Sequence, residues 1–176
     1  MNLFISFSGR KSGNCDTLAQ SIKKPEDSLL FFRDLDVHPC SKCDYSCFQG
    51  QCKYRNDDLF SLFERMLHFD KVIFIVPIYC GNPCSLYFLL NERSQDYFMH
   101  ADSYDEIVSR LYIIGIFGSQ QESPDFLPCL SKWFAHTPYH NRVLGIQRHI
   151  YGQKMHDSIL EIPGIQDLTQ NFLKES

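Results

Sequence analysis

The stretch at residues 8–15 has the residue types of an anion-binding site. It reads Ser-Gly-Arg-Lys-Ser-Gly-Asn-Cys and lies between an apolar, strand-like run at residues 3–7 and a helix-like run at residues 16–22. A helix amino terminus presents unpaired N–H groups and partial positive charge, and glycines let the backbone approach a ligand. The arginine and the lysine add charge. The stretch therefore predicts a phosphate site, with an ordinary turn capped by Asn14 as the alternative.

Two common nucleotide motifs are absent from this stretch. The spacing G-x-G-x-x-G does not occur, and Gly13 is not followed by Lys-Ser or Lys-Thr. A phosphate site here therefore needs support from other parts of the chain.

Four cysteines form a second group that could do chemistry: Cys40, Cys43, Cys47 and Cys52. Four thiolates on a compact segment could hold a [4Fe–4S] cluster. Structural zinc would also take four thiolates, although usually as two pairs further apart. Unligated thiols on a loop near a subunit interface are the third interpretation. Cys80 and Cys84 could be redox partners, but a single x₃ spacing is a weak signal, and we interpret them as small buried residues.

Strand-like and helix-like runs alternate along the chain. The expected strands are residues 3–7, 28–35, 71–77, 111–117 and 142–150. The expected helices are residues 16–22, 59–67, 85–93, 104–109, 125–135 and 165–173. This alternation predicts one α/β domain over residues 1–176, with a doubly wound five-stranded parallel sheet and helices on both faces. The segment at residues 37–56 has neither helical nor strand periodicity and is expected to be a structured loop.

Three polar loops follow expected strands at their carboxyl ends. They are residues 8–15, residues 78–84 and residues 118–123. In doubly wound sheets, ligands bind beyond the carboxyl ends of the strands. The sequence therefore predicts one pocket built from all three loops.

Composition and charge narrow the classes of partner. The chain has 176 residues, with 17 Lys and Arg against 21 Asp and Glu, which gives a net charge of −4. Without a basic stretch, a nucleic-acid partner is not expected. No apolar run reaches the ~18 residues of a membrane span, and the amino terminus has no leader pattern. We expect a cytoplasmic protein, in which structural disulfides are rare.

Three motifs in order carry a resemblance to a known family. They are Ser8-x-Arg10-x-x-Gly13-Asn14-Cys15, then Pro39-Cys40-x-x-Cys43 running to Cys52 and Asp57-Asp58, then Pro77-x-Tyr79-x-Gly81. Together they resemble the NAD(P)H-dependent FMN reductases, which are flavodoxin-like, and their cysteine-bearing branch, the iron–sulfur flavoproteins. The resemblance covers the first half of the chain. In the helix that follows, a lysine and an aspartate of the family are missing and Arg93 is kept.

The resemblance implies FMN bound without a covalent bond. Around its phosphate it would place Ser8, Arg10, Ser12, Gly13, Asn14 and Cys15. Around its ring it would place Pro77, Ile78, Tyr79, Gly81 and Asn82, joined by Gly118 and Ser119 of the third loop. The cysteines depart from the family spacing by one extra residue before Cys47, which favours unligated thiols over a cluster.

The resemblance also implies an activity. NAD(P)H would pass a hydride to FMN, and the electrons would go to an acceptor such as a quinone, another flavin or a protein. A homodimer or homotetramer is expected, with each site bordered by a neighbour. A non-enzymatic electron carrier of the flavodoxin or iron–sulfur flavoprotein kind is one alternative, and a thiol- or metal-based redox sensor is another.

Overall fold

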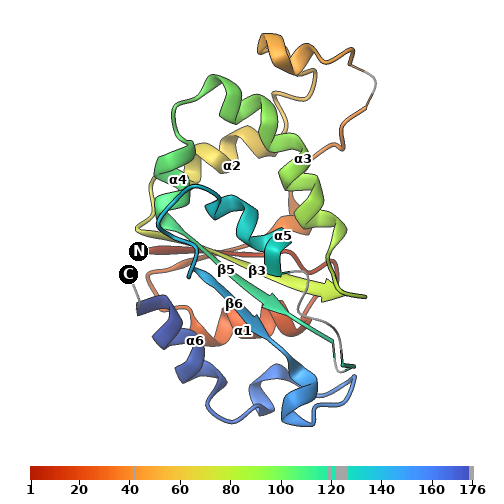
Figure 1. Ribbon diagram of the computed structural model, residues 1–176, viewed down its shortest axis with the longest axis vertical. Coiled ribbons are helices and arrows are strands. Elements are labelled where there is room, and N and C mark those ends of the chain that lie inside the picture. The colour runs from red at the N-terminus through yellow and green to blue at the C-terminus, as the bar shows by residue number, and fades with distance from the viewer. Residues whose placement is uncertain (42, 119, 122–126, 175–176) are drawn as a thin grey trace.

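Five apolar segments form a parallel sheet. The computed structural model describes residues 1–41, 43–118, 120–121 and 127–174. The parallel strands are β1 (Asn2–Ser6), β2 (Ser28–Phe31), β3 (Lys71–Tyr79), β5 (Leu111–Ile116) and β6 (Val143–Ile146). Their order across the sheet is β2-β1-β3-β5-β6 (Figure 1). This is the order of flavodoxin-like sheets, and it confirms the predicted doubly wound arrangement.

A short sixth strand replaces part of an expected loop. β4 (Asn82–Pro83) pairs antiparallel with the end of β3, so that Ile78 opposes Pro83 and Tyr79 opposes Asn82. Cys80 and Gly81 between them have φ angles of 49° and 73°. Positive φ at both central residues is the combination of the type I′ turn, whose twist suits a hairpin. The expected loop at residues 78–84 is therefore wrong in its first half, because β3 continues past Pro77 into this hairpin.

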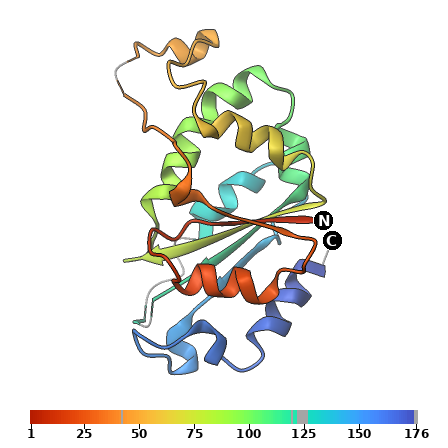
Figure 2. The same cartoon turned by 180° about the vertical axis from the view of Figure 1, so that it is seen from behind.

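Helices cover both faces of the sheet. One face carries α1 (Asn14–Ile22) and α6 (Ile165–Lys174), and the other carries α2 (Asp58–Met66), α3 (Ser85–His100), α4 (Tyr104–Arg110) and α5 (Leu127–Ser131), as Figure 2 shows. Alternate strand residues enter separate cores. Phe4 and Ile73 pack on the α1 side, while Leu3 and Phe74 pack on the α2 side. Both faces are buried, which explains why these strands are continuously apolar.

Two strands end earlier than expected. β2 stops at Phe31, and Phe32–Asp34 forms a 3₁₀ turn (η1) that brings Arg33 to 3.0 Å from the Asp16 carboxylate. β6 stops at Ile146, and Arg148–Tyr151 forms a second 3₁₀ turn (η5). Each turn carries an arginine whose side chain bonds to groups outside the turn, and strand propensity alone does not register such partners.

Two helices also differ from their expected bounds. α3 runs to His100 instead of ending at Arg93, because Tyr97 stacks on Phe63 of α2 with ring centroids 4.8 Å apart. Of the expected helix at residues 125–135, the first two residues lie outside the described part. The rest divides into α5 and a 3₁₀ turn, Lys132–Phe134 (η4).

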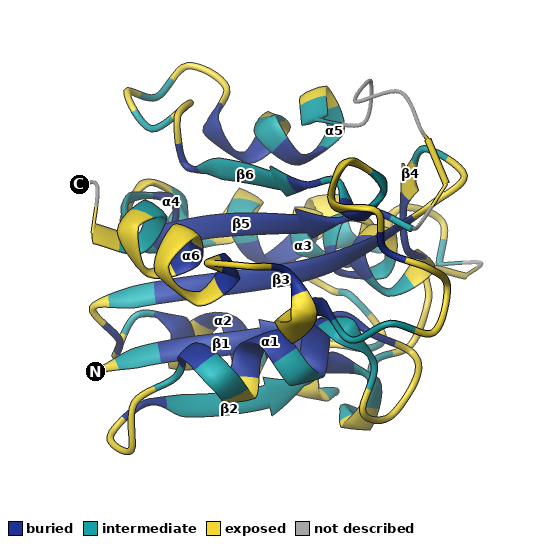
Figure 3. Ribbon diagram, turned by 90° about the horizontal axis from the view of Figure 1, so that it is seen from below, coloured by how far each residue is buried: buried dark blue, intermediate teal, exposed yellow. Residues whose placement is uncertain are grey.

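Burial separates the body of the sheet from its carboxyl edge. The central strands are buried, whereas the loops at the arrowheads in Figure 3 are largely exposed. Among the described residues, no helix has both the length and the apolar character needed to cross a membrane.

Candidate functional site

A small hollow opens at the carboxyl edge of the sheet, which we call the edge hollow. It has a volume of about 60 Å³. It is lined by Ser8, Arg10, Gly13, Asn14, Cys15, Pro77, Ile78, Tyr79, Ile116, Phe117, Gly118 and Arg148. The loops after β1, β3 and β5 thus meet in one place, as the sequence predicts.

A second, more polar depression adjoins it, which we call the polar groove. It has a volume of about 300 Å³. It is lined by residues 10–14, Thr17 and residues 155–158. Arg10, Gly13 and Asn14 line both depressions, so the two form one continuous site. Residues 155–158 were not predicted as part of the site, because their local sequence pattern is not that of a ligand-binding loop.

The Ser8–Cys15 loop is held in shape by its own side chains. The Ser8 hydroxyl donates to the Arg10 carbonyl at 2.9 Å and accepts from the Arg10 N–H at 3.2 Å. A Cβ at Gly13 would lie only 2.9 Å from Ser8 Oγ. Ser8 therefore shapes the loop from within, and glycine at position 13 leaves the hydroxyl its place.

Asp16 braces the loop from below. Its buried carboxylate accepts from Ser6 Oγ at 2.6 Å and from the Ser12 N–H at 2.9 Å. Arg33 pairs with it at 3.0 Å and also donates to the Ser8 carbonyl at 3.0 Å. Because Arg33 takes up the charge of Asp16, this carboxylate does not neutralise Arg10 above it.

Asn14 does not cap α1, contrary to the alternative of an ordinary turn capped by this residue. Gly13 is the N-cap residue, and no side chain caps the helix. Asn14 is the first helical residue, and its Oδ1 accepts from the Ile159 N–H at 3.0 Å. Asn14 is therefore not the cap, and the first turn of α1 still offers N–H groups to an anion.

Two of the expected phosphate residues have other positions. Cys15 lines the edge hollow, but its side chain is buried in the α1-side core, and burial raises the pKa of its thiol well above the ordinary value. Its contribution to a ligand is therefore limited to the backbone. Ser12, with a φ of 57°, lines the polar groove and not the edge hollow.

The residues expected around a flavin ring fall into two groups. Pro77, Ile78, Tyr79 and Gly118 line the edge hollow, with the Tyr79 side chain 47% exposed. Gly81 and Asn82 belong to the hairpin and are not part of that lining, and the Asn82 amide donates to the Cys80 carbonyl at 3.0 Å. Ser119 lies outside the described residues.

Cys80 and Cys84 lie in different environments. Cys80 is exposed at the hairpin turn, whereas Cys84 is buried and its thiol donates to the Phe7 carbonyl at 3.2 Å. Burial raises the pKa of the Cys84 thiol. Burial of Cys84 confirms the packing interpretation for that residue and contradicts it for Cys80, which occupies a turn position.

The four-cysteine segment projects beyond α2 and α3 (Figure 1). Cys40 is exposed, and Cys43, Cys47 and Cys52 are half-buried with free thiols. The described residues contain no group of three or more His, Cys, Asp or Glu side chains placed to hold a metal ion. Ligation by the four thiolates would therefore require the segment to rearrange, and the cluster stays a prediction.

Arg93 attaches this segment to the body of the protein. The buried guanidinium pairs with Asp57 at 2.7 Å and donates to the carbonyls of His38 and Tyr54. Its neighbour Glu92 accepts from the Cys40 N–H at 3.0 Å. The arginine that the family resemblance singled out therefore holds the base of the cysteine segment and does not line the edge hollow.

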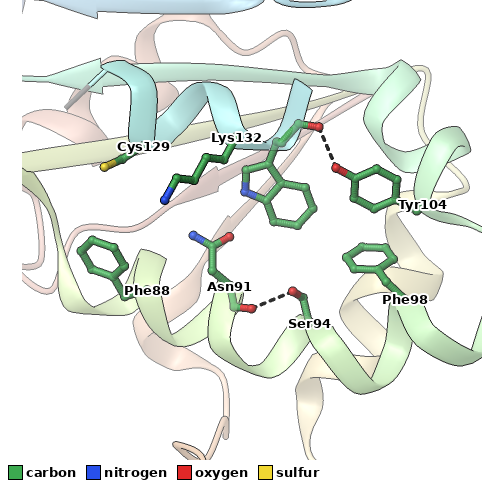
Figure 4. Close-up of a pocket in the computed structure, with 8 residues that line it drawn as sticks. Phe88, Asn91, Ser94, Phe98, Tyr104, Cys129 and Lys132 are labelled. Atoms are coloured by element: carbon green, nitrogen blue, oxygen red, sulfur yellow. Dashed lines mark hydrogen bonds between the residues drawn. The ribbon is translucent and has the colours of Figure 1, made fainter. Parts of the chain in front are cut away.

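A third depression lies between α3 and the segment of α5 and η4 (Figure 4). It has a volume of about 340 Å³ and is lined by Phe88, Asn91, Ser94, Phe98, Tyr104, Cys129, Lys132 and Trp133. The Tyr104 hydroxyl donates to the Trp133 carbonyl at 2.9 Å. Trp133 packs edge-on against Phe74 of β3 and belongs to the core on that face of the sheet.

Comparison with known proteins identifies the fold. No protein-family model matches the sequence. An iron-sulfur flavoprotein of Archaeoglobus fulgidus is 28% identical over 82 residues, which cover 46% of this chain and 40% of that relative's length. The aligned part therefore spans less than half of either protein.

Solved structures resemble the chain over nearly all of its length. The Trp repressor binding protein of Bacillus subtilis has a TM-score of 0.64 at 16% identity, with 100% of this chain and 99% of that chain covered. An FMN-dependent NADH-azoreductase of Bacillus anthracis in complex with FMN has a TM-score of 0.52 at 12% identity, with 99% and 94% covered. The chain has the flavodoxin-like fold that its motifs predicted.

Proposed function

We propose that the protein is an FMN-dependent oxidoreductase, which takes a hydride from NAD(P)H and passes the electrons to a small acceptor such as a quinone or another flavin. Two comparisons support this proposal, because an azoreductase with the same fold is described as FMN-dependent and a sequence relative as a flavoprotein. The observation that carries it is the meeting of three loops and a helix amino terminus in one site at the carboxyl edge of the sheet.

The residues present fit an FMN phosphate. The first turn of α1 has no capping side chain, and Arg10 at its mouth has no carboxylate partner among the described residues. Because the Ser8–Cys15 loop is braced by Asp16 and Arg33, little conformational entropy would be lost on binding. A dianionic phosphate would supply the charge that this arrangement lacks.

The edge hollow is too small to enclose the flat flavin ring, so its fit to the ring is less complete than the fit of the loop to the phosphate. Its volume of about 60 Å³ is well below the ~300 Å³ of a typical ligand pocket, so the ring would be held at the rim. Pro77, Tyr79 and Gly118 form that rim. Bound FMN would supply the hydride and electron chemistry, while the chain orients the ring and sets its electrostatic surroundings.

The test is flavin binding by the wild type and by Arg10→Ala. Purified wild-type protein should show flavin absorbance or acquire it on addition of FMN. Arg10→Ala should weaken FMN binding by about tenfold or more, because a charge-assisted hydrogen bond contributes about 1.5–3 kcal/mol. Circular dichroism should show an intact fold, since Arg10 is exposed.

Arg65→Ala serves as the control, because Arg65 is an exposed cation on α2 and lines neither the edge hollow nor the polar groove. It should leave FMN affinity unchanged. Wild-type protein that stays colourless after addition of FMN would overturn every flavoprotein interpretation and leave a thiol- or metal-based sensor. Bleaching of bound FMN by NADH or NADPH tests the enzymatic part of the proposal.

A second candidate function is electron transfer without an enzymatic reaction of its own. It is favoured by the match to an iron-sulfur flavoprotein together with the four-cysteine segment. A brown, acid-labile chromophore in anaerobically purified protein would indicate a [4Fe–4S] cluster. Indifference of the bound flavin to both NADH and NADPH, with reduction by a ferredoxin, would favour this candidate.

The oligomeric state and the cellular compartment are part of the same proposal. We propose a cytoplasmic homodimer or homotetramer in which a neighbouring subunit borders each flavin site. The family resemblance supports this assembly, and light scattering on the purified protein tests it.

A further inference from the structure

Arg148 is a buried cation in the wall of the candidate site. It follows β6 in the η5 turn, and its side chain is 5% exposed. It lines the edge hollow together with Arg10, Gly13 and Asn14. The sequence reasoning did not identify it, because it placed Arg148 inside an expected strand at residues 142–150.

The hydrogen bonds of Arg148 go to neutral acceptors. Nε donates to Gln153 Oε1 at 3.1 Å, and Nη2 donates to the carbonyls of Lys154 and Asp157 at 2.7 and 2.9 Å. Within the described residues, Nη1 has no hydrogen-bond partner and no carboxylate pairs with this guanidinium. Two other buried or nearly buried arginines do pair with carboxylates, Arg93 with Asp57 and Arg33 with Asp16.

The charges around Arg148 leave its own charge under-compensated. The carboxylates of Asp157 and Glu161 act on it at longer range, and both already accept hydrogen bonds from backbone N–H groups. Burial and the nearby charge of Arg10 lower the pKa of Arg148. A buried charge is costly unless an opposite charge or strong hydrogen bonds compensate it, so an anion between the two arginines would relieve both.

We propose that Arg148 is a second phosphate-binding residue, which together with Arg10 selects FMN over riboflavin. This inference rests on the proposed function and adds to it a residue from the far end of the chain. The ligand group is a phosphate monoester, because the same site combines two guanidinium groups with the open first turn of α1.

Arg148 also contacts the segment that lines the polar groove. Of its two carbonyl partners, Lys154 immediately precedes the residue 155–158 segment that lines the polar groove, and Asp157 belongs to it. The guanidinium thus connects the edge hollow to the groove wall. A role in shaping this wall would affect every ligand of the site, whereas a direct bond to phosphate would affect only phosphorylated ligands.

The experiment measures the dissociation constants of FMN and riboflavin for the wild type, Arg148→Met and Arg148→Lys. Arg148→Met should weaken FMN binding by about 10- to 100-fold, the equivalent of one lost charge-assisted bond, and riboflavin binding by less than about threefold. The FMN affinity of Arg148→Lys should lie between those of the wild type and Arg148→Met, because lysine keeps the charge but loses the planar, forked geometry.

Arg142→Met is the matched control. Arg142 immediately precedes β6, is 8% exposed and donates to the Ser109 carbonyl. It is a buried arginine at the other end of the same strand and lines neither depression. The substitution should lower stability and leave the ratio of the two dissociation constants unchanged.

Three outcomes would overturn the proposal. An equal loss of FMN and riboflavin affinity in Arg148→Met would indicate a structural role, and an unchanged FMN affinity would indicate none. Wild-type protein that does not bind FMN would overturn the proposed function and this inference together, whereas the first two outcomes leave the proposed function intact. If Arg148→Met does not fold, the ratio measured with Arg148→Lys decides.

Discussion

At the scale of single residues, the shape of the Ser8–Cys15 loop depends on contacts of a few atoms. Ser8 Oγ is held between the N–H and the carbonyl of Arg10, and Gly13 passes close to it. Two glycines in this loop differ in their surroundings. A Cβ at Gly13 would lie 2.9 Å from Ser8 Oγ, whereas a Cβ at Gly9 would have no atom within 4 Å.

Gly13→Ala should therefore weaken FMN binding, because the added methyl group displaces the Ser8 hydroxyl from Arg10. The loss of a partly buried hydrogen bond should also lower the free energy of unfolding by about 1 kcal/mol. Gly9→Ala should change neither quantity. Flavin titration and urea denaturation of the two variants measure both effects, and equal behaviour of the two alanine variants would contradict this account of the loop.

At the scale of elements, α2 and α3 are joined by aromatic stacking and by one strong hydrogen bond. Tyr97 of α3 stacks on Phe63 of α2, and its hydroxyl donates to Glu64 Oε1 at 2.6 Å. Burial, followed by this bond to a carboxylate, raises the pKa of Tyr97 to about 12 from its ordinary value of 10.0. The contact between α2 and α3 therefore depends on the protonation state of Tyr97.

The sign of the pH dependence follows from the raised pKa. Between pH 10 and about 12, the folded protein keeps the Tyr97 proton that the unfolded chain has already lost. This contribution to stability is fully present below pH 10 and is lost as the pH rises through about 12. The tyrosinate absorbance of the wild type minus that of Tyr97→Phe should report this late titration.

Glu64→Gln tests the assigned cause, since it removes the negative charge and keeps an acceptor in place. The difference titration of Tyr97 should then move to lower pH. A Tyr97 that titrates at the ordinary value in the wild-type protein would contradict both its burial and its hydrogen bond to Glu64.

At the scale of the whole molecule, the candidate site joins segments from both ends of the chain. The loop after β1 meets the hairpin after β3 and the turn after β6, and Asn14 bonds to the backbone of Ile159. The paired Arg33 and Asp16 add a connection between η1, which follows β2, and α1. A ligand at this site would therefore stabilise the fold as a unit.

FMN at about 100 times its dissociation constant should raise the free energy of unfolding by about 2.7 kcal/mol, because it binds the folded state alone. For a chain of this size, that corresponds to an increase in melting temperature of about 5–10 °C. Differential scanning calorimetry with and without FMN measures the increase. A melting temperature that does not respond to FMN while the flavin remains bound would contradict a site assembled from these segments.

The sequence by itself determined the sheet and the side of the sheet on which the site lies. The continuously apolar runs that became β1, β3 and β5 predict buried parallel strands, and their polar followers predict the loops at the carboxyl edge. The positions of Ser8, Arg10, Pro77 and Tyr79 around one hollow could be predicted for the same reason. These properties depend on residues that are close in sequence, so the local hydrophobic pattern is enough to predict them.

Only the tertiary structure decided which side chains complete the site and which serve elsewhere. Arg148 joins the site although it is 138 positions from Arg10 in the printed sequence, and Arg93 goes to the cysteine segment. Cys15 turns into the core, and the hairpin at Cys80 and Gly81 arises from pairing with β3. Except for this hairpin, whose two strands are neighbours in sequence, each depends on a partner distant in sequence. A side chain's burial, ion pairing and hydrogen bonding are set by three-dimensional neighbours that local patterns do not contain.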